Sequence, residues 1–127
     1  MIKIKHLCDA VEADDGRRLW VEPVGLTVDM REWCRIDALL PGIAPPGKLT
    51  EWLEKHRDGY EYFRGEYHNH LTHAALRPLL MELACDALTE NITLVHQGDN
   101  PEENTGTALY EFLTELQPYC RTRKGKR

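Results

Sequence analysis

Three of the six histidines lie close together in the stretch EYHNHLTHAAL, which runs from Glu66 to Leu76. Imidazole nitrogens bind zinc and exchange protons near neutral pH, so the stretch could form a metal site or a nuclease-like His-Asn-His site. The apolar periodicity predicts a helix here, and at about 100° per residue His68 and His73 project from opposite flanks of it. A nuclease-like site therefore cannot form from this helix alone.

One strip of the same helix still has the composition of a metal site. Glu66, His70 and His73 recur at i, i+4 and i+7. Two imidazoles and a carboxylate could hold zinc or nickel if a fourth ligand came from elsewhere. Arg77 follows at the end of the strip, where its charge opposes a cation. We therefore expect a solvated flank and no metal, with this strip as the weak alternative.

A second polar cluster follows the apolar run Asn91–Gln97. A histidine beside several carboxylates is the minimum set for general acid–base catalysis, but the spacing here is equally typical of a solvated loop with a helix cap at Asn104 or Thr105. The sequence contains no phosphate loop, dinucleotide fingerprint, nucleophile elbow or zinc-protease motif, so we assign no catalytic residue and no cofactor. The candidate ligand-binding residues are Glu22, His96, Gln97, Asp99, Asn100 and Asn104.

The elements that must position these residues alternate between strands and helices. Strands are predicted at Ile2–Leu7, Arg18–Glu22 and Asn91–Gln97, and helices at Met30–Ile36 with Asp29 as the N-cap, from Lys48 or Thr50 onward, and at Tyr60–His73, Leu76–Leu88 and Thr105–Leu116. This order predicts an α/β fold with a small, mostly parallel sheet in a Rossmann-like three-layer arrangement with flanking helices. Ligands of such sheets bind beyond the carboxyl ends of the strands.

Two of the predicted helices have a clear apolar face. In the helix at Tyr60–His73, the face is expected to carry Tyr60, Phe63, Tyr67, Leu71 and Ala74. In the helix at Thr105–Leu116, it is expected to carry Ala108, Leu109, Phe112, Leu113 and Leu116. We expect both faces to pack against the sheet.

The size and charge of the chain limit its class. A chain of 127 residues with 42% apolar residues is long enough for one domain, which we place at residues 1–118. No run is long enough to cross a membrane and the N-terminus is too polar for a signal peptide, so we expect a cytoplasmic protein without a membrane partner. Residues 119–127 form a basic tail that we expect to be disordered, and it is the part of this acidic chain that could touch nucleic acid.

The four cysteines are predicted to be reduced. Cys8, Cys34, Cys85 and Cys120 are widely spaced and form no CxxC pair, so neither a zinc ribbon nor a redox motif is indicated. Cytosolic proteins keep such thiols reduced, and Cys34 and Cys85 lie in apolar surroundings that favour packing over reactivity.

Four segments in order resemble a known family: DG-R-LxVE, DALLPGIAPPGKLTEWL, GYEYFRGEYHNHL and ITLVHQGDNPEENTGTALYEFL. They are similar to the YeaO-like branch of the domain of unknown function 488 family and cover about residues 1 to 116. The matching positions are Asp15, Gly16, Arg18, Val21, Asp37, Leu39, Ile43, Pro45, Leu49, Phe63, Arg64, Tyr67, Leu71, Thr93, Leu94, Asn100, Asn104 and Leu113. The resemblance implies the fold of that family.

The departures from the family concern its basic residues. Where the family carries Asp-Arg-Leu-Trp-Pro-Arg-Gly after the second strand, this chain has EPVGLTV, so Pro23 and Thr27 replace both arginines. After the late strand, Asp99 and Thr105 stand where the family has a basic residue and a histidine. Arginine forms a planar fork for phosphate or carboxylate, and Glu22 beside Asp99 would repel such an anion. The resemblance therefore implies a divergent, inactive member of the family.

Two hypotheses of function follow. The first is a binding or assembly module without catalysis, in which exposed apolar surface recruits a protein partner or a second copy. The apolar strip Pro23–Val28 at the mouth of the former pocket suggests that the pocket is filled or is covered by a partner. The alternative is a small-molecule or nucleotide-processing enzyme that uses the loop after the late strand. An open polar cleft at Gln97–Asn100 lined by Arg18 or Arg35 would favour the enzyme.

Overall fold

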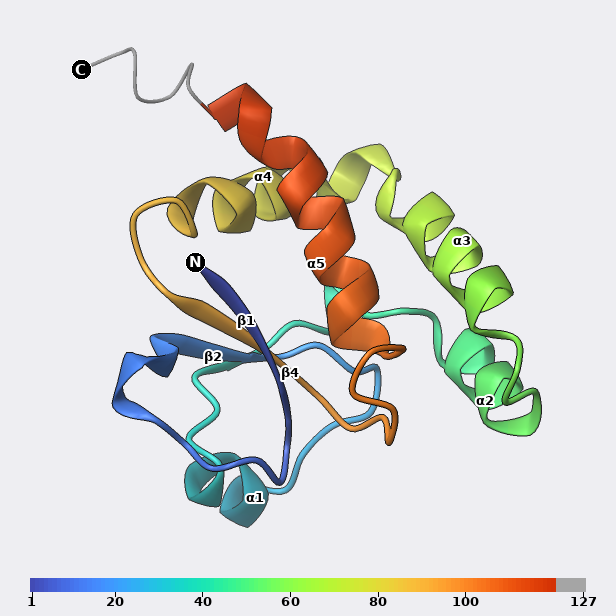
Figure 1. Cartoon of the computed structure of the whole chain (residues 1–127), viewed down its shortest axis with the longest axis horizontal. Coiled ribbons are helices and arrows are strands. Elements are labelled where there is room, and N and C mark those ends of the chain that lie inside the picture. Colours follow the sequence, from blue (N-terminus) through green and yellow to red (C-terminus); the bar gives the residue numbers. More distant parts are fainter. Residues whose placement is uncertain (121–127) are drawn as a thin grey trace.

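The computed structural model describes residues 1–120 of the chain (Figure 1). Its strands are β1 (Ile2–His6), β2 (Arg17–Trp20), β3 (Ala38–Leu39) and β4 (Ile92–His96), and its helices are α1 (Val28–Trp33), α2 (Gly47–Lys55), α3 (Tyr60–Leu71), α4 (Arg77–Asp86) and α5 (Thr105–Leu116). Short 3-10 turns occupy Ala13–Asp15, Pro41–Ile43, Ala74–Leu76 and Gln117–Cys120. The predicted α/β class is confirmed.

Within residues 1–120 the strands form one parallel sheet in the order β1-β4-β2-β3. Strand β4 lies between β1 and β2, and Leu94 pairs with Ile4 on one side and with Leu19 on the other. All five residues of β4 are buried. A strand buried on both faces is a continuous apolar, β-branched run, which is why the sequence predicted β4 clearly.

The sequence did not predict β3, which spans only Ala38–Leu39 at the edge of the sheet. Two residues carry no periodic pattern. The strand is held in place by Asp37, whose backbone N–H donates to the Arg18 carbonyl at 2.8 Å and whose carboxylate accepts from the Arg18 backbone N–H at 2.8 Å. The second parallel neighbour of β2 is therefore anchored by one residue in a loop.

One face of the sheet is covered by α3, α4 and α5, and α1 lies on the opposite side (Figure 1). The larger core joins the sheet to the apolar faces of these helices, with Leu94, Phe63 and Leu109 fully buried. The smaller core, on the side of α1, is built around Trp20 and Val95. The sheet and its two covered faces give the Rossmann-like three-layer arrangement that was predicted.

The predicted apolar face of α3 is confirmed except at its end. Tyr60, Phe63, Tyr67 and Leu71 are buried, whereas Ala74 is exposed and lies beyond the helix. The helix ends at Leu71, two residues earlier than predicted, because the chain turns at Thr72 and enters a 3-10 turn. In α5, Ala108, Leu109, Leu113 and Leu116 are buried and Phe112 is half-buried, as predicted.

The helix caps were predicted with mixed success. Asn104 caps α5, since its side-chain oxygen accepts from the Thr107 backbone N–H at 2.9 Å. The cap of α1 is Thr27, whose hydroxyl accepts from Met30, so the prediction of Asp29 was wrong. Asp29 instead lies in the first turn of α1, where a carboxylate suits the positive end of the helix.

The face of the sheet that carries α1 also has a cluster of charges around Asp15. This carboxylate is 1% exposed and accepts from Arg18 Nη1 at 2.6 Å, while Lys3 Nζ and Lys5 Nζ lie 2.8 and 2.9 Å away. Burial raises the pKa of Asp15, but the hydrogen bonds from Lys3 and Lys5 outweigh it and hold the pKa well below the usual range. Asp15 therefore stays ionised and neutralises cations from both β1 and β2.

Gly16 permits this arrangement. Its φ is +65°, a conformation that residues with a Cβ rarely adopt, and a Cβ at this position would lie 1.9 Å from the Asn91 carbonyl oxygen. The close approach lets the Arg17 backbone N–H donate to that same carbonyl at 3.2 Å. The turn through Asp15 and Gly16 that the sequence predicted thus fixes the start of β2 beside β4.

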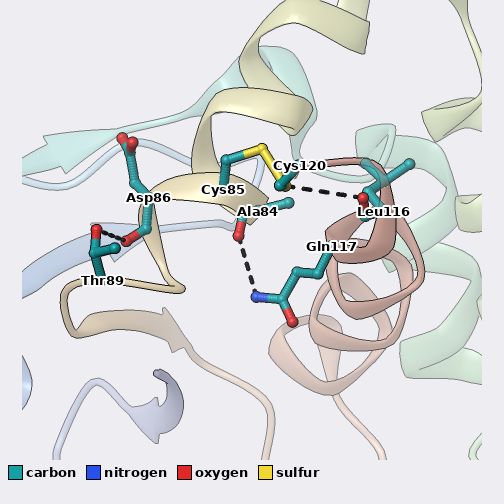
Figure 2. Close-up of a disulfide and its surroundings, with 7 residues drawn as sticks. All are labelled: Ala84, Cys85, Asp86, Thr89, Leu116, Gln117 and Cys120. Atoms are coloured by element: carbon teal, nitrogen blue, oxygen red, sulfur yellow. Dashed lines mark hydrogen bonds between the residues drawn. A yellow bond between two sulfur atoms is a disulfide. The ribbon is translucent and has the colours of Figure 1, made fainter. Parts of the chain in front are cut away.

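Cys85 in α4 and Cys120 after α5 form a disulfide (Figure 2). The prediction of four reduced cysteines is therefore wrong for this pair, whereas Cys8 and Cys34 are free. Their sequence separation of 35 residues hid the pairing, because only the packing of α4 against α5 brings the two Cα atoms to 5.4 Å. Beside the bond, Gln117 Nε2 donates to the Ala84 carbonyl at 3.1 Å.

The disulfide also extends the domain beyond its predicted end at residue 118. The 3-10 turn Gln117–Cys120 continues from α5, and Cys120 is 1% exposed. The first two residues of the predicted tail, Tyr119 and Cys120, thus belong to the fold. The rest of the predicted disordered tail, 121–127, lies outside the described residues.

We expect the double variant Cys85→Ser, Cys120→Ser to lose about 3–4 kcal/mol of unfolding free energy, because the bond removes conformational freedom from a loop of this length in the unfolded chain. Urea unfolding of the oxidised protein and of the variant measures the difference. Cys8→Ser, at the exposed free cysteine, is the control and should change the free energy by less than about 0.5 kcal/mol. An unchanged midpoint for the double variant would show that the bond adds nothing to stability.

Asp15→Asn should destabilise the protein by about 3–5 kcal/mol at neutral pH, since it leaves the buried guanidinium of Arg18 without its counter-charge and takes one partner each from Lys3 and Lys5. Because the folded pKa of Asp15 is lowered, its contribution is complete above the unfolded pKa of about 3.9 and declines as the pH falls below it. The difference between variant and wild type should therefore shrink between pH 6 and pH 3 in urea titrations. A difference that stays constant with pH would contradict the role of the charge.

Candidate functional site

The carboxyl ends of β2 and β4 open onto a hollow of about 370 Å³. Its walls come from the loop after β2, the end of α2, the start of α3, the loop after β4 and the start of α5. This is the position at which parallel α/β sheets bind ligands, so the structure places a cavity where the fold predicts one. We call it the carboxyl-edge hollow, and it is lined by Glu22, Thr50, Leu53, Glu54, Arg57, Tyr60, Phe63, Gln97, Gly98, Asp99, Asn100, Glu103, Asn104 and Thr105.

Most of the ligand-binding residues chosen from the sequence meet in this hollow. Glu22, Gln97, Asp99, Asn100 and Asn104 all line it. The parallel register of β2 and β4 brings the two loops together, because both strands end at the same edge of the sheet. That these residues bind a ligand stays a prediction. The sixth residue of the set takes a different position.

That residue is His96, which is buried and does not line the hollow. Its Nδ1 accepts from the Gly98 backbone N–H at 3.1 Å, and its ring meets the ring of His6 edge-on at 5.6 Å. Burial, with the charge of His6 as a smaller cause, lowers the pKa of His96 to about 4. His96 is therefore neutral at pH 7 and fixes the turn after β4, so the pairing of a histidine with the loop carboxylates does not form.

Glu22 forms the buried end of the hollow. It is 4% exposed, and its two carboxylate oxygens accept from the Gln97 backbone N–H at 3.0 Å and from the Thr105 hydroxyl at 2.9 Å. Burial raises the pKa of Glu22, while these two hydrogen bonds oppose the rise. Thr105 is the first residue of α5, so the carboxylate lies at the positive end of that helix. The chain thus places its own anion where a bound anion would be stabilised.

The two asparagines of the loop use their polar atoms to shape it. Asn100 Oδ1 accepts from the backbone N–H groups of Glu102 and Glu103 at 2.8 and 3.0 Å. Asn104 Nδ2 donates to the Asn100 carbonyl at 2.9 Å, while its Oδ1 caps α5. These bonds hold the loop as a rigid rim and leave the carboxylates of Asp99 and Glu103 as its charged groups.

The charge of the lining is strongly acidic. The carboxylates of Glu22, Glu54, Asp99 and Glu103 face one guanidinium, that of Arg57. The sequence did not point to Glu54 and Arg57, because α2 has no motif and reaches the hollow only by packing against α3. The sequence offered one signal for these two residues: both are charged and lie near the end of the helix that precedes Gly59.

Two structural features were expected to separate the binding module from the enzyme, and neither hypothesis is fully met. The polar cleft at Gln97–Asn100 is open, but Arg18 and Arg35 line a separate hollow on another part of the sheet. The apolar strip Pro23–Val28 does not fill the cleft either, since none of it lines the carboxyl-edge hollow and Val28 is 72% exposed. The loop Pro23–Val28 therefore does not contribute to this hollow.

The predicted histidine strip does not assemble. His73 lies beyond the end of α3, and its Nδ1 accepts from the Ala75 backbone N–H at 3.4 Å. Among residues 1–120, Glu66, His70 and His73 do not converge, because the i+7 position required two further residues of helix. On the other flank of α3, His68 helps to hold the helix against α5, since its Nε2 lies 2.7 Å from the Ala108 carbonyl oxygen.

One acidic cluster does converge in the part of the chain that the structure describes. Ligand oxygens of Glu12, Asp14 and Asp15 lie within 4.8 Å of one another. Lys3 and Lys5 already occupy the space between them, with Lys3 Nζ 2.9 Å from Asp14 and Lys5 Nζ 2.6 Å from Glu12. The two ammonium groups occupy the position that a metal ion would need, so we do not interpret the cluster as a metal site.

Comparison with known proteins adds one finding. A family described as the inactive DUF488-N3 subclade matches residues 1–123, which is nearly the whole chain. The comparisons with curated proteins and with solved structures gave no match.

We expect Glu22→Gln to become more stable relative to wild type as the pH rises. The folded pKa of Glu22 is raised, so its favourable contribution is present below the unfolded pKa of about 4.3 and is lost as the pH rises through the folded value. Glutamine has no such loss, so the gap in unfolding free energy between variant and wild type should widen as the pH rises from 4 to 7.

Urea unfolding at several pH values measures this gap. Glu54→Gln is the matched control, because it removes an exposed carboxylate from the same hollow and should show no comparable pH dependence. A gap that narrows with rising pH would contradict the buried position of the Glu22 carboxylate.

Proposed function

The chain belongs to the inactive DUF488-N3 subclade, and on this premise we propose that it is a non-catalytic binding module whose carboxyl-edge hollow takes a small organic cation. The resemblance noted in the sequence, that of a divergent member of the 488 family, agrees with this assignment. The fold of the family is retained while the basic residues expected in its pocket are replaced.

The charge of the lining is the observation that carries the proposal. Four carboxylates and one guanidinium surround a hollow of about 370 Å³. An ammonium or guanidinium group would gain Coulomb energy from this lining, and a phosphate would be repelled by it. Glu22 at the buried end is already held by Gln97 and Thr105, so it needs no rearrangement to receive a positive group.

The remaining walls suit the apolar part of such a ligand. Leu53, Tyr60 and Phe63 line the hollow next to the carboxylates. Tyr60 is held by its hydroxyl, which donates to the Asn104 carbonyl at 3.1 Å. Small-molecule sites typically combine an apolar wall with a few fixed polar groups in a volume of about 300–1,000 Å³, and this hollow has both properties. An alkyl or aryl amine meets these requirements.

The alternative of a small-molecule or nucleotide-processing enzyme has less support. Acid–base catalysis needs a titrating group within reach of the substrate, and His96 lies outside the hollow with its Nδ1 already engaged. A nucleotide would bring its phosphates against Glu22, Glu54, Asp99 and Glu103. The same lining that favours a cation therefore disfavours this class of substrate.

Assembly is a second candidate function, and it is favoured by the surface of α1. Trp33 is 85% exposed, with Val28 72% and Val24 51% exposed nearby in the chain. An exposed tryptophan costs hydration free energy that burial in an interface recovers. We infer a second copy of this chain as the occupant, because a two-fold dimer needs only one patch that is complementary to itself.

The location of the protein belongs to the same proposal. Among the described residues no helix combines the length and the apolarity needed to cross a bilayer. The predicted cytoplasmic location stays a prediction, and the bond between Cys85 and Cys120 is the feature that opposes it, since cytosolic reductants keep thiols reduced. Contact of the basic tail with nucleic acid likewise stays a prediction.

Titration with agmatine, choline and putrescine tests the hollow by calorimetry and by backbone amide NMR. We expect at least one of these cations to bind and to shift the Gln97 amide, which donates to Glu22. Glu22→Gln should weaken binding about tenfold or more, the cost of losing one buried charge pair. Affinity should also fall when the pH is lowered enough to protonate Glu22.

Glu115→Gln is the control for that titration, because it removes one exposed carboxylate of α5 that does not line the hollow. It should leave the affinity unchanged. Tighter binding of succinate or AMP than of any amine would overturn the proposal.

Sedimentation velocity at increasing protein concentration tests the assembly. A dimer that Trp33→Ser returns to monomer, with an unchanged circular dichroism spectrum, would support self-association through α1. Sedimentation as a monomer at high micromolar concentration would exclude it.

A further inference from the structure

A second hollow, of about 450 Å³, lies at the other end of β2. It is bordered by Gly16 before β2, by Arg18 within β2, and by Arg35 and Asp37 before β3, with Val11 and Glu12 on the far side. It shares no lining residue with the carboxyl-edge hollow. We call it the amino-edge hollow, and the binding module proposed above makes no use of it.

Arg18 lines this hollow and has one side-chain donor without a partner in the described part of the chain. The residue is 2% exposed, its Nε donates to the Cys34 carbonyl at 3.0 Å and its Nη1 donates to Asp15 at 2.6 Å. Its Nη2 is buried and has no hydrogen-bond partner within residues 1–120. Guanidinium N–H groups can only donate hydrogen bonds, and a buried N–H group without an acceptor is unfavourable. A ligand that brings a hydrogen-bond acceptor would satisfy this remaining donor of Arg18.

Arg35 places a second guanidinium on the same hollow from an unusual backbone position. Its φ is 55°, in the left-handed region, at the turn that ends α1. Glycine is the residue that this turn favours, because a side chain adds strain there. Arg35 forms no hydrogen bond or ion pair through its side chain within the described part of the chain. Within the described residues, Arg35 is therefore an unpaired cation at a position where the backbone conformation favours glycine.

The charges around the two arginines limit the ligand. Lys3, Lys5 and Arg18 are neutralised by the carboxylates of Glu12, Asp14 and Asp15. Arg35 and Asp37 remain, so the hollow has little net charge and one free guanidinium. A dianionic phosphate would meet Asp37 and Glu12, whereas a single carboxylate can accept from Arg18 Nη2 and from Arg35 with its two oxygens.

We propose that the amino-edge hollow is a binding site for a carboxylate, which accepts hydrogen bonds from the unpaired Nη2 of Arg18 and from the guanidinium of Arg35. The carboxylate can belong to a free small acid or to the C-terminus of a polypeptide. Both sources present the same pair of oxygens.

Titration of the full-length protein with acetate, succinate, trialanine and inorganic phosphate tests the site, with the Arg18 Nε–H resonance and calorimetry as readouts. We expect the carboxylates to bind at millimolar concentrations or below, to shift the Arg18 resonance, and to bind more tightly than phosphate. Tighter binding of succinate than of trialanine identifies a free acid as the source, and the reverse identifies a chain terminus.

Arg35→Gly is the decisive variant, because it removes the cation while placing the favoured residue at a positive φ. It should melt at the same temperature as wild type or a few degrees higher, and it should bind carboxylates about tenfold more weakly, which is the loss of one charge-assisted hydrogen bond. Arg77→Gln is the matched control: it removes one exposed arginine of α4 that lines neither hollow and should leave carboxylate binding unchanged.

Three results would overturn the proposal. They are the absence of any shift of the Arg18 resonance at tens of millimolar carboxylate, an equal loss of binding in Arg77→Gln and in Arg35→Gly, and a preference for phosphate over every carboxylate.

Discussion

The buried carboxylate of Asp15 is the interaction on which the rest of this sheet depends. It neutralises Lys3 and Lys5 of β1 and Arg18 of β2, and its backbone carbonyl accepts from the Thr93 hydroxyl of β4 at 2.7 Å. The three neighbouring strands are therefore tied to one residue in addition to their backbone ladder. Without that charge, the buried guanidinium of Arg18 would have no counter-charge, and Lys3 and Lys5 would keep only the exposed carboxylates of Glu12 and Asp14.

The two ends of the sheet differ in electrostatic character because their charges are paired in different ways. At the amino ends, the Asp15 cluster leaves one guanidinium N–H of Arg18 without a partner. At the carboxyl ends, the chain supplies Glu22 to the Gln97 amide and the Thr105 hydroxyl, at the positive end of α5. An internal carboxylate thus occupies the position that favours an anion.

Several features could be predicted because they depend on neighbours in the sequence. The buried run of β4, the periodic faces of α3 and α5 and the Asn104 cap are local patterns with a single physical interpretation. Most of the candidate site could be predicted as well, because parallel strands end at one edge of the sheet and Glu22 and Gln97 follow such strands. The exception was His96, for which strand alternation left both directions open and burial chose the one away from the hollow.

The remaining features were decided by contacts between distant segments. Glu54 and Arg57 reach the hollow because α2 packs against α3, Cys85 meets Cys120 because α4 packs against α5, and β3 forms because Asp37 binds the backbone of Arg18. By itself the sequence determined the class of fold and the order of its main strands and helices. Only the tertiary structure decided which charges are neutralised by one another, because ion pairs and disulfides depend on distances in space that sequence separation does not fix.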